Sequence, residues 1–263
     1  MKSDLLRFSD WTDPVPPAER EVVSRLPEDD DQGHPPLLFV PGLGHGAWAY
    51  AEHWLGHAAG RGFAAHALTP RPGGDLRAQV HDVVQTAASL PRQTVLIGHG
   101  VGALVVSRAL SRYPARAAVL VAPVLDGWAA LGAALRSNPF GTLPAVFGGR
   151  LRLSARQMFG PSLPVEEAAA YLERVDARPR AELLGRAAPP APVGAPPTLV
   201  AGSPDDRIVR RGALDKAAAH YGGAPLLFPG MGHDLMLDTG WVEPIDAILD
   251  WLGKEAGLSG PGH

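Results

Sequence analysis

The chain has 263 residues, a length that suits one large α/β domain or two small ones. Its 46% hydrophobic content is enough for a sizeable core, and its formal net charge of −3 predicts neither nucleic acid nor an anionic membrane as partner. Because the sequence has no cysteine, it excludes disulfides and thiolate chemistry. We expect a cytoplasmic protein, since residues 1–13 lack the apolar core of a signal peptide and no stretch reaches the roughly 18 apolar residues of a membrane span.

Short apolar strands alternate with helices through the first 121 residues. The strands are expected at Arg20–Leu26, Leu37–Val40, Phe63–Leu68, Thr94–Ile97 and Ala117–Val121. The helices are expected at Ala47–Ala59, from an N-cap at Asp75 to about Leu90, and at Val101–Tyr113. This alternation predicts a mostly parallel sheet with helices on both faces.

The alternation stops at Pro123 and resumes after Pro196, and the residues between are mostly helical with turn signals. Two more strands are expected at Thr198–Ala201 and Ala224–Phe228, with helices at Arg210–Tyr221 and Val242–Trp251. We therefore predict an α/β core of about eight strands, formed by residues 1–123 and 197–256. A helical lid, residues 124–196, is predicted after the sixth strand, and residues 257–263 are predicted to be a disordered tail.

A Gly-x-Gly-x-Gly turn joins a strand directly to a helix at residues 98–102. The turn reads Gly98-His99-Gly100-Val101-Gly102, between the apolar strand at Thr94–Ile97 and an apolar helical pattern. This strand–turn–helix context is typical of a nucleophile elbow, whose central residue is normally serine. The central residue here is Gly100, which has no side chain with which to attack a substrate.

Three other segments supply groups with useful chemistry, each directly after a predicted strand. The loop Pro41–Gly46 is rich in glycine, so its backbone N–H groups can face a ligand without side-chain obstruction. An acidic pair, Asp205 and Asp206, follows one late strand, and His233 follows the next. The chain order of elbow, acid and histidine is that of hydrolases with a nucleophile elbow.

Together these motifs make the chain resemble the α/β-hydrolase fold superfamily, especially its lidded esterase and hydroxynitrile-lyase-like members. The resemblance covers roughly residues 20–252. It implies that the N–H groups of Leu43 and Val101 form an oxyanion hole and that His233 is the general base. It also implies an orienting aspartate, for which we favour Asp206 while Asp205 remains the alternative. The sequence departs from the family pattern at Gly100 and at Pro41, where a histidine often opens the oxyanion loop.

A base and an oxyanion hole remain useful without a nucleophile. They can remove a proton next to a carbonyl group and hold the resulting enolate. We therefore expect non-covalent acid/base catalysis of the lyase, isomerase or cyclase type on a small apolar carbonyl compound, and by analogy with the fold we expect a role in secondary metabolism. The alternatives are an esterase-like hydrolase that activates water directly, and an inactive small-molecule binding protein.

Other residues are expected near the substrate. These are Gly42, His45, His99 and Trp128, although His99 is better explained as a packing residue. His53 and His57 lie four residues apart on a predicted helix, but no third ligand accompanies them, so we expect no metal and no cofactor. The expected partner is a small, largely apolar molecule, and the sequence does not indicate an oligomeric state.

Overall fold

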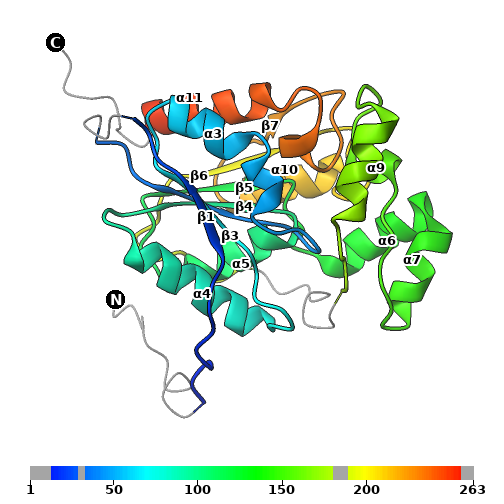
Figure 1. Cartoon of the computed structure of the whole chain (residues 1–263), viewed down its shortest axis with the longest axis horizontal. Coiled ribbons are helices and arrows are strands. Elements are labelled where there is room, and N and C mark those ends of the chain that lie inside the picture. Colours follow the sequence, from blue (N-terminus) through cyan, green and yellow to red (C-terminus); the bar gives the residue numbers. More distant parts are fainter. Residues whose placement is uncertain (1–12, 29–32, 180–188, 256–263) are drawn as a thin grey trace.

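A seven-stranded sheet forms the centre of the protein in a computed structural model, which describes residues 13–28, 33–179 and 189–255 (Figure 1). The strand order is β1-β3-β2-β4-β5-β6-β7. Only β1 runs antiparallel to its neighbour, and every other pair of adjacent strands is parallel. The predicted tail at residues 257–263 lies outside the described residues.

The strands are short and occur where apolar, often β-branched residues cluster. Their bounds are β1 Val22–Arg25, β2 Leu37–Val40, β3 Ala65–Leu68, β4 Val95–His99, β5 Ala117–Val121, β6 Thr198–Gly202 and β7 Leu226–Leu227. All residues of β2, β3, β4 and β5 are buried, as expected for parallel strands that are covered on both faces. The prediction of about eight strands exceeds the seven found because no further apolar run pairs with the described sheet.

Helices cover both faces of the sheet. One face packs against α2 Trp48–Ala51, α3 Trp54–Gly60 and α11 Val242–Glu255, and the other against α4 Leu76–Ser89, α5 Val101–Ala109 and α10 Arg211–His220. Figure 1 shows α3 and α11 above the sheet and α4 and α5 below it. Side chains of β4 alternate between the two cores, with Ile97 in one and Leu96 in the other. The predicted cap at Asp75 is present, since its carboxylate accepts a hydrogen bond from the Ala78 N–H at 2.7 Å.

Among the described residues, four further helices lie between β5 and β6. They are α6 Gly127–Ser137, α7 Pro139–Val146, α8 Ala155–Met158 and α9 Val165–Glu173. This helical segment therefore follows the fifth described strand and not the sixth as predicted, because the chain forms five strands before it. Among the described residues, no helix is both long and apolar enough to cross a membrane.

The sheet brings the predicted site residues to one edge. Gly100, Asp206 and His233 all follow the carboxyl ends of parallel strands, namely β4, β6 and β7. Ligands of open α/β sheets bind at this edge, where the connections leave the strands. The fold therefore places three segments far apart in the sequence beside a common site.

Candidate active site

The turn after β4 holds Gly100 in a conformation that favours glycine. Its φ of +54° and ψ of −119° lie outside the regions that L-residues usually adopt, and it is the N-cap of α5. Gly102 permits a close approach of β2, since a Cβ there would lie 2.2 Å from the carbonyl oxygen of Val40. The glycines therefore fix a sharp turn from strand to helix at the edge of the sheet.

His233 and Asp206 form a buried pair beside this turn. His233 Nδ1 lies 2.7 Å from Asp206 Oδ2, and both side chains are almost fully buried. The other oxygen of Asp206 accepts hydrogen bonds from the N–H groups of Ile208 and Val209 at 2.7 and 3.0 Å. These contacts hold the carboxylate in the direction of Nδ1, so the ring of His233 has a fixed orientation.

Asp205 lies outside this pair. It is exposed, and its carboxylate accepts a hydrogen bond from the Gly230 N–H at 2.8 Å. Of the two alternatives that the sequence left open, the structure brings only Asp206 to His233.

The environment of His233 changes its affinity for a proton. Burial lowers the pKa of the ring, but the charge and hydrogen bond of Asp206, with the charge of Asp234, raise the pKa above its ordinary value. A histidine with these surroundings can accept a proton from a bound molecule and hold it as an imidazolium.

The second ring nitrogen of His233 faces Gly100. A Cβ built on Gly100 would lie 3.2 Å from His233 Nε2, and the next nearest heavy atom, Gly42 Cα, would lie 3.6 Å away. Because Nδ1 is bonded to Asp206, Nε2 is the nitrogen that can exchange a proton at this position. The Gly100 turn and the His233–Asp206 pair are therefore parts of one site.

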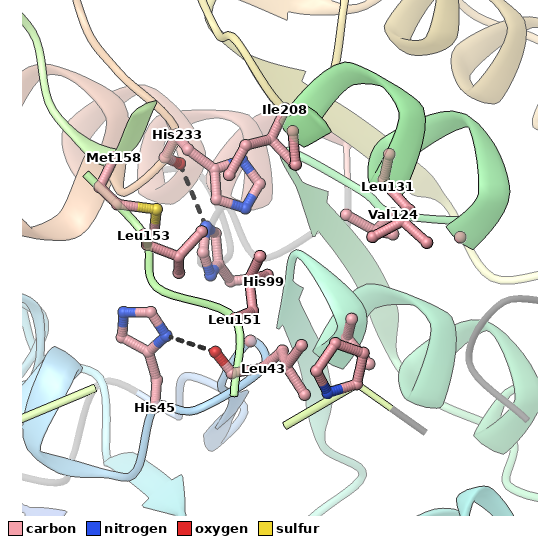
Figure 2. A pocket seen from close by; sticks show the side chains of 16 residues that line it. Leu43, His45, His99, Val124, Leu131, Leu151, Leu153, Met158, Ile208 and His233 are labelled. Carbon is pink, nitrogen blue, oxygen red and sulfur yellow. Dashed lines mark hydrogen bonds between the residues drawn. The ribbon is translucent and has the colours of Figure 1, made fainter. Parts of the chain in front are cut away.

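A cavity of about 80 Å³ lies against His233 (Figure 2). Leu43 and Val101 line it, as do Gly42, His45 and His99. Val101 opens α5, so its N–H is one of those that have no partner within the helix. Most of the remaining lining residues are apolar: Val124, Gly127, Ala130, Leu131, Ala134, Leu151, Leu153, Met158, Pro179 and Ile208.

Trp128 does not line this cavity, although the sequence analysis placed it near the substrate. It lies on the outer side of α6 with 53% of its surface exposed. The neighbouring Ala130, Leu131 and Ala134 face the cavity from the other side of the same helix. Trp128 and the cavity-lining residues therefore lie on different sides of α6.

A buried cluster that the sequence analysis missed lies behind His233. Asp234 is fully buried, and its Oδ2 accepts a hydrogen bond from His45 Nε2 at 3.0 Å. His99 Nε2 lies 3.4 Å from Asp234 Oδ1 and 3.1 Å from the carbonyl oxygen of His233. The only available signal was that Asp234 directly follows His233.

The charges in this cluster are set by burial and by the neighbouring rings. Burial lowers the pKa of His99 to about 3, together with the repulsion of His233, so His99 is neutral near pH 7. Burial raises the pKa of Asp234, but His45 and the other two histidines lower it below its ordinary value. Asp234 is therefore an ionised carboxylate that accepts a hydrogen bond from His45, and the neutral His99 packs beside it while also lining the cavity.

His53 and His57, which the sequence places four residues apart on a helix, each make a different contact. His57 pairs with Asp246 at 2.7 Å, and His53 stacks on Trp241. Ligand atoms of His99, His233 and Asp234 do lie within 4.8 Å of one another. However, His99 Nε2 already donates to the carbonyl oxygen of His233, and His233 Nδ1 is bonded to Asp206.

Solved structures share this architecture. A monoacylglycerol lipase from Paleococcus ferrophilus is 18% identical with a TM-score of 0.66, and the match covers 89% of this chain and 98% of the lipase. A soluble variant of the monoglyceride lipase from Saccharomyces cerevisiae is 11% identical with a TM-score of 0.69, over 90% and 92% of the two chains. The esterase RhEst1 from Rhodococcus sp. ECU1013 is 20% identical with a TM-score of 0.65, over 89% and 94%. At these identities the likeness shows the fold alone.

A family model gives the classification. A search of curated protein sequences finds no match. The model of the alpha/beta hydrolase family matches residues 37–250, which is most of the chain and includes the Gly100 turn, Asp206 and His233. The chain therefore belongs to the alpha/beta hydrolase family.

Proposed function

We propose that the protein is a hydrolase that cleaves small, largely apolar esters without forming an acyl-enzyme. In this proposal Gly100 occupies the position of the family's nucleophile. His233 removes a proton from a water molecule, Asp206 orients His233, and the N–H groups of Leu43 and Val101 stabilise the oxyanion. The apolar lining of the cavity, the family, and the lipases and esterases among the structural neighbours all support an ester substrate.

One observation carries this proposal. The Cβ position of Gly100 lies 3.2 Å from His233 Nε2, so a side chain there would occupy the space in front of the base. With glycine, a water molecule can bind within hydrogen-bond distance of His233 Nε2, and the Val101 N–H remains available to the oxyanion. Attack by this water on the carbonyl carbon gives a tetrahedral oxyanion, and its collapse releases the alcohol, which takes the proton from His233.

The apolar cavity also supports a second candidate function. The same base can remove a proton next to a carbonyl group in a lyase, isomerase or cyclase reaction, and few polar side chains compete for that proton. This reaction needs His233, Asp206 and the oxyanion hole but no bound water. The two functions therefore differ in the atom from which His233 takes a proton.

The test measures ester hydrolysis and covalent labelling on the same proteins. We expect slow hydrolysis of p-nitrophenyl butyrate by the wild type, with no initial burst, and a loss of roughly 10²–10⁴-fold in H233A. The variant H220A is the control, because His220 is exposed at the end of α10. A fluorophosphonate should leave the wild type unmodified and should label G100S, whose new hydroxyl lies beside His233.

Four outcomes would change the proposal. Covalent labelling of the wild type would contradict a mechanism without an acyl-enzyme. Hydrolysis that is equal in the wild type and H233A would remove His233 from the reaction. If esters are not cleaved but the wild type, and not H233A, exchanges deuterium next to the carbonyl of a bound ketone, the second candidate is correct. Ligand binding by both proteins without turnover or exchange would indicate a binding protein.

A further inference from the structure

Helices α6 and α7 expose an unusual amount of apolar surface. Phe140 and Phe147 have 91% and 82% of their surface exposed, and Trp128, Leu135, Leu143 and Val146 are also exposed. These six are most of the ten large apolar side chains exposed in the described part of the chain, and they lie within residues 128–147. Large apolar side chains that are exposed together on neighbouring helices are typical of an interaction site.

These side chains lie on the outward sides of α6 and α7. Phe140, Leu143 and Phe147 are spaced three and four residues apart, which places them on one side of α7. The opposite side of α7 is buried through Gly141, Thr142 and Ala145. Figure 1 shows α6 and α7 side by side at one end of the molecule, away from the sheet. We call this surface, formed by the six exposed side chains, the α6–α7 face.

Positive charge accompanies the α6–α7 face. Residues 127–164 contain four arginines, Arg136, Arg150, Arg152 and Arg156, and no aspartate or glutamate. All four arginines are exposed, and only Arg150 has an acidic partner among the described residues, since it pairs with Asp176 at 2.9 Å. The whole chain has a net charge of −3, so this segment differs in sign from the rest of the protein.

We propose that the α6–α7 face docks the protein on an anionic lipid surface. Phenylalanine, tryptophan and leucine side chains insert into the boundary between headgroups and acyl chains, and arginines beside them contact anionic headgroups. A lipid surface explains both the exposed aromatic rings and the positive charge. The rings complement the apolar acyl chains, and the arginines complement the anionic headgroups. The earlier expectation of no membrane partner rested on the charge of the whole chain, which averages over this segment.

Docking in this way would place the bilayer next to the cavity wall. The inner side of α6 lines the cavity through Gly127, Ala130 and Leu131, while its outer side carries Trp128. One helix therefore separates the lipid surface from the site, and an apolar substrate dissolved in the bilayer has a short path to His233. The docking itself does not depend on the reaction proposed for the site.

The test is sedimentation of the full chain with lipid vesicles. We expect binding to phosphatidylcholine vesicles that contain phosphatidylglycerol and much weaker binding to phosphatidylcholine alone. The double variant F140S/F147S should bind at least about tenfold more weakly, because each phenylalanine buries its ring in the lipid. R136Q should weaken binding about fivefold at low salt, and added salt should reduce this difference.

Matched variants separate this proposal from its alternatives. L26S removes an apolar side chain that is 67% exposed beyond β1, and R211Q removes an exposed arginine of α10, so both should bind vesicles as the wild type does. Equal binding by F140S/F147S and the wild type would overturn the proposal. If the wild type is a dimer without lipid and F140S/F147S is a monomer by light scattering, the face is a protein interface and the proposal is wrong.

Discussion

Two adjacent aspartates after β6 make different contacts, and this difference predicts their roles. Asp206 is buried against His233, whereas Asp205 is exposed and its carboxylate accepts a hydrogen bond from the Gly230 N–H. The charge of Asp206 raises the pKa of His233, so D206N should lower that pKa and move the acid limb of kcat/KM to lower pH. Turnover should fall by roughly 10²–10⁴-fold because the ring loses its orientation.

The control for D206N is D205N, and the measurement is a pH profile of kcat/KM for each protein. D205N should leave the midpoint of the acid limb unchanged. A profile that moves in D205N and not in D206N would assign the orienting role to the other carboxylate.

Gly100 supplies the second prediction at the residue scale. G100A should destabilise the protein by about 1–2 kcal/mol, because an L-residue is strained at a φ of +54°. Its methyl group would also lie 3.2 Å from His233 Nε2, where the proposed water binds, so hydrolysis should fall well below the wild-type rate.

A second glycine distinguishes the effect of backbone strain from the effect of filling the space in front of His233. Gly222 has a φ of +81°, and a Cβ there would meet no atom within 4 Å. G222A should therefore lose a similar free energy of unfolding in urea but keep its hydrolytic rate. Full activity in G100A would show that the space in front of His233 is not used.

At the scale of elements, a carboxylate joins the helical segment to the loop that carries His233. Buried Asp238 accepts hydrogen bonds from the N–H groups of Gly160, after α8, and Gly232, before His233, both at 2.7 Å. A Cβ on Gly232 would lie 2.4 Å from the carbonyl oxygen of Met158, so the two segments are in close contact. Met158 also lines the cavity, which connects the helical segment to the site.

This contact predicts a large effect for D238A. Removing the carboxylate leaves buried N–H groups without partners, so the free energy of unfolding should fall by roughly 2–5 kcal/mol. D215A is the control, because Asp215 forms an exposed ion pair with Arg211 and should change stability by less than about 0.5 kcal/mol. Urea unfolding measures both, and equal values would show that the Asp238 contact adds no stability.

Elements with a strong local pattern could be predicted from the sequence. The apolar run at Leu37–Val40 and the cap at Asp75 lie where expected, because continuous burial and a side-chain cap leave local signals. Asp238 and Asp234 could not be predicted, since their partners Gly160 and His45 are distant in the sequence. The position of Trp128 outside the cavity lining could not be predicted either, because composition does not show which side of a helix faces a cavity.

At the scale of the whole molecule, one buried histidine makes stability depend on pH. The pKa of His99 is lowered to about 3 in the folded protein, mainly by burial, whereas the unfolded chain binds this proton near pH 6.5. Below pH 6.5 the unfolded state therefore holds a proton that the folded state lacks. The free energy that His99 contributes is present above pH 6.5 and falls by about 1.4 kcal/mol per pH unit as the pH drops toward 3.

The variant H99Q tests this dependence, because glutamine can still donate a hydrogen bond to the carbonyl oxygen of His233 but cannot titrate. Urea unfolding at several pH values between 6.5 and 4 should give a slope for H99Q that is smaller than the wild-type slope by about 1.4 kcal/mol per pH unit. His233 acts in the opposite direction, since its raised pKa stabilises the folded state at low pH, but this effect is common to both proteins. Equal slopes for H99Q and the wild type would show that His99 takes up a proton in the folded protein. The buried cluster of His99 and Asp234 would then contain a charged histidine and not a neutral one.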